Sequence, residues 1–187
     1  ISVLIIGPRR LGKTSFVRNL CKRWESLDYG DSVLMDVYSV SSHQDFLLQL
    51  VSAIAQKKGR LSKIMEWSRK LLPSVVKLGS EMVGGAISFH WNDSQAEQEK
   101  KLCIQQTLSS LTQLQSQTCL VIDECQQLSK ENLADSGWLE ATIRQNMQDQ
   151  VGKVAYLLTG SRRDMIHAMT NDSARPLYRA CQLIEFP

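Results

Sequence analysis

The sequence predicts an α/β fold in which a parallel β-sheet is covered by helices on both faces. Short apolar runs bounded by turn residues alternate along the chain with segments whose apolar residues recur at helical spacing. The 187 residues are 43% hydrophobic and 22% charged, which suffices for one domain with its own core. We therefore expect residues 1–187 to form one compact domain.

Five segments are predicted to be strands. Each is short and nearly continuously apolar, which is typical of parallel strands that are buried on both faces. These segments are Ser2–Ile6, Ser32–Tyr38, Thr118–Ile122, Val154–Leu158 and Cys181–Phe186.

Helices are predicted between these strands, because apolar residues recur there three or four positions apart. The first helix is expected to open at about Lys13, and a short last helix is expected over Asp164–Met169. The apolar positions of the others are Phe46, Leu47, Leu50, Val51 and Ile54 after the second strand, Ile104, Leu108 and Leu111 before the third, and Leu139, Ile143 and Met147 before the fourth.

Residues 59–91 do not follow this alternation and are predicted to be an insertion. We expect a helix over Leu61–Leu72, a break at Pro73, and then a short strand or hairpin that ends near Trp91. Residues 57–77 hold seven Lys and Arg against one Glu, a net charge of +6. Such a stripe can bind nucleic acid or an acidic partner, although it is more often a solvated helix face.

Composition excludes several classes of protein. The net charge of +3 is too small to argue for nucleic-acid binding by itself, and no apolar stretch approaches the roughly 18 residues that span a bilayer. The five cysteines include no C-x-x-C pair, which favours reduced, mostly buried thiols in a cytoplasmic protein. The chain opens inside an apolar run without an initiator Met, so we expect a piece of a longer protein.

The first predicted strand leads into a glycine-rich loop that fits the pattern G-x-x-x-x-G-K-[ST]. Its backbone N–H groups and the following helix N-terminus are expected to wrap a polyphosphate, with Lys13 on the β- and γ-phosphates and Thr14 on Mg²⁺. Loop arginines are usually solvated, so Arg9 and Arg10 could instead lie in solvent without a direct phosphate contact. The expected nucleotide-binding residues are Gly7, Pro8, Arg9, Arg10, Leu11, Gly12, Lys13, Thr14 and Ser15.

The second candidate site is acidic. It lies at the end of the third predicted strand, where Asp123 and Glu124 follow each other. A phosphate-binding loop needs a carboxylate that holds Mg²⁺ through its water shell, and Asp123 is placed for this role. Two adjacent carboxylates repel each other, so Glu124 is better explained as the general base that deprotonates the attacking water.

The absence of two motifs narrows the class of P-loop protein. The chain has neither the N-K-x-D motif that reads guanine nor the L-S-G-G-Q string of transporter ATPases. The remaining class is the ATP hydrolases with an extra strand between the loop strand and the Asp-Glu strand, and Ser32–Tyr38 is available for it.

The fourth predicted strand ends in polar residues that would lie between the phosphate site and Glu124. Thr159 and Ser161 are candidates to contact the γ-phosphate or the attacking water. Either could instead cap the short helix that follows, and the two roles are compatible.

The motifs, in their order along the whole chain, resemble those of the archaeal-type ATPase family. This family is related to the STAND and AAA+ groups of P-loop ATPases. The matching strings are G-P-R-R-L-G-K-T-S, D-E-C-Q, L-T-G-S and P-L-Y-R. The resemblance implies a P-loop NTPase three-layer sandwich with a five-stranded sheet in the order 5-1-4-3-2 and ATP at the strand carboxyl ends. It also implies a lid and effector region after the fifth strand, which this chain would lack.

The resemblance further implies an arginine that acts in trans, supplied just before the fifth strand by a neighbouring subunit. Arg175 and Arg179 are the candidates here, and Pro176 favours an extended backbone that would expose Arg175 at the domain edge. Both could instead pair with local acids such as Asp172 or Glu185.

We therefore expect the ATP- and Mg²⁺-binding core of a regulatory or signalling ATPase, which could assemble as a homo-oligomer through the edge near Arg175 and Arg179. Two alternatives remain open. The chain could hold nucleotide with negligible turnover, or it could be a nucleic-acid-associated ATPase that uses the basic insertion.

Overall fold

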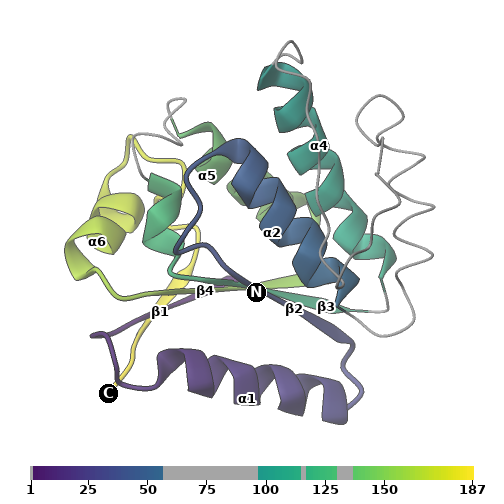
Figure 1. The fold of residues 1–187 in the computed structure, drawn as a ribbon. Coiled ribbons are helices and arrows are strands. Elements are labelled where there is room, and N and C mark those ends of the chain that lie inside the picture. Colours follow the sequence, from purple (N-terminus) through teal and green to yellow (C-terminus); the bar gives the residue numbers. More distant parts are fainter. Residues whose placement is uncertain (1, 57–96, 115–116, 130–136) are drawn as a thin grey trace.

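A computed structural model describes residues 2–56, 97–114, 117–129 and 137–187 (Figure 1). Its centre is a five-stranded parallel sheet in the order β2-β3-β4-β1-β5, which confirms the order 5-1-4-3-2 expected from the sequence. The strands are β1 (Ser2–Ile6), β2 (Asp31–Asp36), β3 (Thr118–Asp123), β4 (Val154–Gly160) and β5 (Gln182–Glu185).

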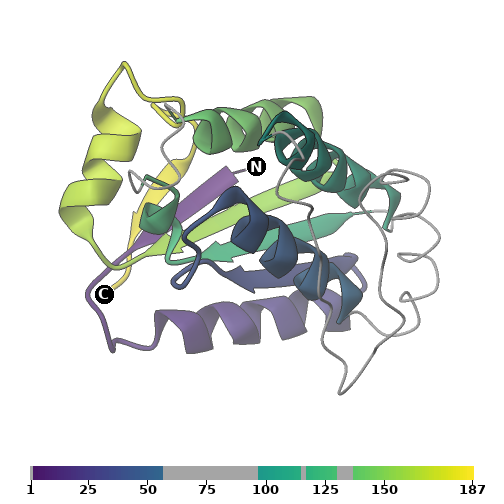
Figure 2. The ribbon, with the colours of Figure 1, turned by 45° about the horizontal axis from the view of Figure 1, so that its top comes forward.

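Helices cover both faces, as expected. Helix α1 (Lys13–Ser26) lies on one face, and the remaining α-helices lie on the other (Figures 1 and 2). These are α2 (His43–Ala55), α4 (Glu97–Ser109), α5 (Trp138–Asp149) and α6 (Arg163–Asn171), and the short 3₁₀ helices are η1 (Ser110–Gln113) and η2 (Cys125–Ser129).

Side chains that alternate along each strand divide the core into two parts. The larger part packs between the sheet and the four-helix face, and the smaller part packs beneath α1. Burying one large apolar side chain stabilises the fold by about 1.5–3 kcal/mol, so both parts hold the sheet in place. Leu4, Ile6, Leu120, Ile122, Phe46, Leu50, Ile104 and Ile143 belong to the larger part, and Ile5, Val17, Cys21, Cys119, Val121 and Leu157 form the smaller one.

Four of the five strands differ at one or both ends from the ranges expected from the sequence, and β1 matches its expected range. Strand β4 continues to Gly160 because Thr159 and Gly160 still pair with β1. Strand β2 ends at Asp36, whose carboxylate accepts a hydrogen bond from the N–H of Tyr38 at 2.8 Å and turns the chain out of the sheet. Strand β5 was expected to be covered on both faces, but it is the sheet edge and all four of its residues are exposed.

The sequence analysis also led to expectations about the insertion, the five cysteines and membrane-spanning segments. The predicted insertion of residues 59–91, with its helix, break and hairpin, and the whole basic stripe of residues 57–77 lie outside the described residues. Cys21, Cys103, Cys119 and Cys125 are buried and Cys181 is half-buried, all as free thiols. Within the part of the chain that the structure describes, no helix is both long and apolar enough to cross a membrane.

Candidate functional site

The glycine-rich loop joins β1 to α1 at the carboxyl edge of the sheet. Gly12, at the start of α1, has a φ of 85°, a left-handed conformation that glycine adopts at little cost. No described side chain caps α1 and its first turn holds no acidic residue. The helix N-terminus therefore presents uncompensated N–H groups and a positive dipole, which favour an anion such as a phosphate.

Lys13 is folded back onto this loop. Its side chain is 6% exposed, and its Nζ donates to the carbonyl oxygens of Gly7 and Pro8 at 2.5 and 2.6 Å. Burial lowers the pKa of Lys13, although Glu124 and Asp123 act in the opposite direction. The ammonium group is thus held by neutral acceptors beside the loop that is expected to receive phosphate.

The carboxylate of Asp123 lies at the meeting point of three strand ends. Its side chain and that of Thr159 point to the α1 face, because each lies two residues beyond a member of the smaller core. Thr14 Oγ1 donates to Asp123 Oδ2 at 2.6 Å, and Thr159 donates to Oδ1. The backbone N–H of Glu124 also donates to Oδ1, at 3.0 Å.

These contacts bring together the two residues that the sequence assigned to Mg²⁺. A hydroxyl oxygen and a carboxylate oxygen side by side are donors that Mg²⁺ prefers, and it needs only one or two carboxylates when phosphates and water supply the rest. The donor set of Thr14 and Asp123 therefore fits a magnesium ion. No group of three or more His, Cys, Asp and Glu that could hold a metal occurs among the described residues.

Glu124 follows directly, with a φ of 58° that is unusual for a residue other than glycine. Its Oε2 accepts hydrogen bonds from Ser161 Oγ at 2.7 Å and from Gln126 Nε2 at 2.5 Å. Helix α6 has Arg162 at its N-cap position and no side-chain cap. Thr159 and Ser161 therefore bind the two acidic residues, and the helix-capping role considered from the sequence is not observed.

A cavity of about 460 Å³ opens above these groups. Five of the residues predicted to bind nucleotide do not line it, and one of these, Leu11, is 48% exposed. The five are Gly7, Pro8, Leu11, Thr159 and Ser161. The cavity contains three cationic side chains and one carboxylate, a balance that suits a polyanion. Its lining residues are Arg9, Arg10, Gly12, Lys13, Thr14, Ser15, Tyr38 and Glu124.

Tyr38 is a site residue that sequence reasoning missed. It follows β2, and the guanidinium carbon of Arg9 lies 5.5 Å from the centroid of its ring, within range of a cation–π contact. Arg9 Nε also lies 3.4 Å from Ser161 Oγ. The signal available in the sequence was an aromatic residue at the carboxyl end of a predicted strand, the edge of the sheet where the phosphate loop also lies.

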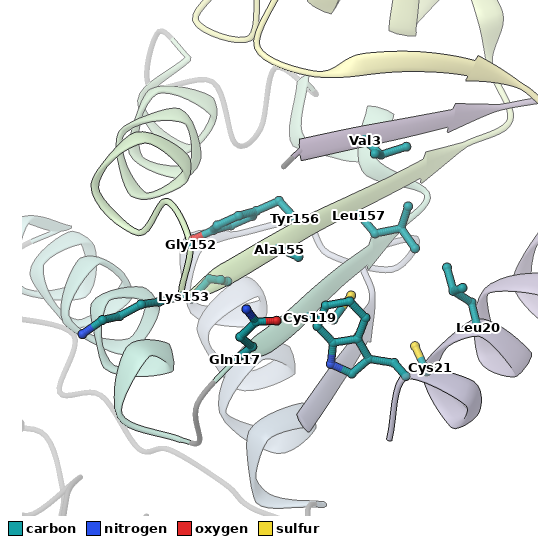
Figure 3. Close-up of a pocket in the computed structure, with 12 residues that line it drawn as sticks. Val3, Leu20, Cys21, Gln117, Cys119, Gly152, Lys153, Ala155, Tyr156 and Leu157 are labelled. Atoms are coloured by element: carbon teal, nitrogen blue, oxygen red, sulfur yellow. The ribbon is translucent and has the colours of Figure 1, made fainter. Parts of the chain in front are cut away.

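A second cavity, of about 440 Å³, lies on the α1 face (Figure 3). Cys119 is at the opposite end of β3 from Asp123, roughly 13 Å away along the strand. The lining is mostly apolar, and the Lys153 side chain extends away from it (Figure 3). Burial, together with Cys21, raises the pKa of Cys119 to about 12, so this thiol is unreactive. Neither the charge nor the position of this cavity suits a nucleotide phosphate.

The segment before β5 departs from expectation at Arg175. Its guanidinium donates to Oε1 of Glu140 and, at 2.9 Å, to Oγ of Ser129. The Glu140 side chain is fully buried and that of Arg175 is 33% exposed. Arg175 is therefore turned inward onto α5, whereas the sequence led us to expect it at the domain edge or paired with Asp172 or Glu185.

Arg179 takes the exposed position instead. It has a φ of 49°, and its guanidinium lies 5.1 Å from the ring centroid of Tyr178. Within the described ranges it forms no ion pair. Arg144 of α5 donates to the carbonyl oxygens of Pro176 and Tyr178 at 2.5 and 2.7 Å, which fixes the segment that carries Arg179.

We predict that Arg175→Ala lowers the free energy of unfolding by about 3–5 kcal/mol, because it leaves the buried Glu140 carboxylate without its cation. Arg179→Ala is the matched control and should change it by less than about 0.5 kcal/mol. Urea denaturation of the two variants measures the difference. Equal, small effects would contradict the inward placement of Arg175.

Solved structures share this fold at low sequence identity. A Walker-type ATPase of Pyrococcus abyssi is 20% identical and superposes with a TM-score of 0.58. The match covers 98% of this chain and 48% of that one. The ORC2 protein of Aeropyrum pernix, solved in ADPNP and ADP complexes, is 14% identical, with a TM-score of 0.59 over 100% and 41% of the chains. The ORC1 protein of Aeropyrum pernix, solved in complex with DNA, is 13% identical, with a TM-score of 0.56 over 100% and 39%.

This chain thus spans less than half the length of these three structures. Among curated proteins, no sequence matches it significantly. A family model described as an AAA domain matches residues 2–169, which include the loop, both acidic residues and the end of β4. The chain belongs to this AAA domain family.

Proposed function

We propose that this domain binds ATP with Mg²⁺ and hydrolyses it to ADP and phosphate, as the core of a regulatory ATPase of the STAND and AAA+ type. The contact of Thr14 with Asp123 at 2.6 Å carries the proposal, because it joins the phosphate-loop helix to the acidic strand end. Hydrolysis requires these two groups at one place, and Glu124 beside them.

The phosphates of ATP are expected to bind at the N-terminus of α1. There the uncapped N–H groups supply donors without needing a change of conformation. Lys13 would exchange the carbonyl oxygens of Gly7 and Pro8 for phosphate oxygens, which are stronger acceptors for an ammonium group. Arg9 and Arg10 line the same cavity and add positive charge to it.

Thr14 and Asp123 would hold Mg²⁺, which when bound neutralises charge on the phosphate oxygens. Thr159 and the N–H of Glu124 both donate to Oδ1 of Asp123, so the carboxylate keeps one orientation. Oδ2 then remains directed at Thr14. This arrangement explains why β4 carries a hydroxyl residue at its end.

Glu124 is the proposed general base. It would accept a proton from a water molecule whose oxygen attacks the γ-phosphorus, while the bond between the γ-phosphorus and the oxygen bridging to the β-phosphate breaks and ADP leaves. Glu124 lines the same cavity as Lys13 and Thr14, which supports this role.

The main alternative is a module that holds nucleotide with negligible turnover, and the two readings differ only in steady-state phosphate release. Nucleic-acid binding through residues 57–77 stays a prediction from charge alone. Neither negligible turnover nor nucleic-acid binding would change the contacts expected for the nucleotide.

We predict that Lys13→Ala abolishes ATP binding and leaves the fold intact, because the ammonium group serves the loop and the phosphate rather than the core. Isothermal titration with ATP and Mg²⁺ measures the affinity, and the circular dichroism spectrum checks the fold. Lys153→Ala, on a lysine that extends away from the second cavity, is the control. An unchanged ATP affinity for Lys13→Ala would show that the loop does not bind phosphate.

Glu124→Gln should retain binding of ATP with Mg²⁺ and lose hydrolysis by about 10²–10⁴-fold, the contribution typical of a general base. Phosphate release at saturating ATP measures this. Glu185→Gln is the control, because this exposed carboxylate of β5 does not line the cavity. Hydrolysis at the parent rate in Glu124→Gln would eliminate it as the base, and a parent protein without turnover would favour the alternative.

We also propose that Arg179 completes the active site of a neighbouring copy, since it is exposed and its segment is fixed by Arg144. An Arg179→Ala protein mixed with a Glu124→Gln protein should then recover activity that each lacks alone, because one supplies the base and the other the arginine. Arg163→Ala, on α6, is the control. If Arg179→Ala alone hydrolyses at the parent rate, the arginine has no such role.

A further inference from the structure

Gln126 is a fully buried residue that the proposed reaction does not yet use. It lies in η2, immediately after Glu124 and Cys125, and its exposed fraction is 0%. Because Glu124 adopts a left-handed φ of 58°, the backbone reverses there, and the N–H of Gln127 donates to the carbonyl oxygen of Glu124 at 3.0 Å. The reversal brings the Gln126 side chain back to the carboxylate two residues before it.

Two donors converge on a single oxygen of that carboxylate. Gln126 Nε2 lies 2.5 Å from Glu124 Oε2, and Ser161 Oγ lies 2.7 Å from the same atom. The backbone N–H of Ser161 in turn donates to Gln126 Oε1 at 3.4 Å. From the described residues, no hydrogen-bond donor reaches the other oxygen, Glu124 Oε1.

The end of β4 is shaped around the same amide. A Cβ atom at position 160 would lie 2.6 Å from Gln126 Oε1 and 2.3 Å from Ile166 Cδ1, both far inside van der Waals contact. Ile166 is itself fully buried in the larger core, so it has little room to move away. Glycine at position 160 therefore leaves the space that the Gln126 amide occupies.

We infer that Gln126 is a positioning residue for Glu124. Its amide and the Ser161 hydroxyl fix Oε2, which leaves Oε1 as the oxygen that takes the proton from the attacking water. A base held in one orientation loses less freedom when the reaction occurs, and a fixed geometry is worth large factors in rate. The inference rests on the proposed ATP hydrolysis and names a residue that acts through the base rather than on the nucleotide.

The adjacent glutamine offers a matched control. Gln127 lies in the same turn and is 5% exposed, but its buried Oε1 has no hydrogen-bond partner. Gln126→Leu and Gln127→Leu therefore make the same chemical change at neighbouring buried positions, and only the first removes a donor from Glu124.

The test measures kcat and KM for ATP hydrolysis, and the affinity for the non-hydrolysable analogue ADPNP with Mg²⁺, in both variants. Gln126→Leu should lower kcat by about 10- to 100-fold, the factor that corresponds to one hydrogen bond to a charged group. Its KM and ADPNP affinity should stay within about twofold of the parent, because Gln126 does not line the cavity. Gln127→Leu should leave kcat within about twofold.

A second variant and a second measurement make the test independent of folding and turnover. Gln126→Glu keeps the size of the side chain but replaces the donor by an acceptor, and it should lose at least as much kcat as Gln126→Leu. In nucleotide-free protein, the side-chain N–H protons of Gln126 should resonate downfield of those of Gln127 in an ¹⁵N–¹H spectrum. They should shift upfield in Glu124→Ala, which removes the acceptor.

Three results would overturn the inference. The first is an unchanged or raised kcat in both Gln126 variants while Glu124→Gln is inactive, which leaves the proposed function standing. The second is a parallel loss of ADPNP affinity and kcat, which would make Gln126 a general structural residue. The third is a Gln126 amide resonance that Glu124→Ala does not move. If Glu124→Gln hydrolyses at the parent rate, the proposed function fails as well.

Discussion

The carboxylate of Asp123 is the contact on which the candidate site depends. Its two oxygens are divided between Thr14, at the start of α1, and Thr159, at the end of β4. Strand β4 lies between β3 and β1 in the sheet, so this one side chain ties the loop that follows β1 to a strand that is not its neighbour. Without it, the phosphate loop and the acidic strand end would be related only through the backbone pairing of β1 and β3 with β4.

The two adjacent acidic residues at the end of β3, Asp123 and Glu124, make different contacts. Asp123 is buried and holds Thr14, whereas Glu124 is turned by its left-handed backbone toward the cavity and toward η2. Two neighbouring carboxylates would repel each other if they faced the same space. Thr159 of β4 donates to Asp123, whereas Ser161, which follows β4, and Gln126 of η2 donate to Glu124. These separate donors explain how both carboxylates are kept at one strand end.

Much of this arrangement could be predicted because it is encoded locally. The strands and the approach of Thr14 to Asp123 follow from apolar runs and from motifs at strand ends, and the sheet order follows from the family resemblance. Arg175 could not be placed in this way, because its partner Glu140 is 35 residues earlier and only the packing of α5 brings the two together. Gln126 was missed for a similar reason: a single amide in a 3₁₀ turn has no periodicity, and its meaning depends on Gly160.

The most direct test of the account is a crystal structure of this domain with ADPNP and Mn²⁺, with anomalous scattering used to locate the metal. The account predicts one manganese peak beside Thr14 Oγ1 and Asp123, phosphates at the N-terminus of α1, and Lys13 Nζ moved from the carbonyl oxygens of Gly7 and Pro8 to the phosphates. A nucleotide bound elsewhere, or a Lys13 that stays on those carbonyl oxygens with the metal away from Thr14, would contradict it.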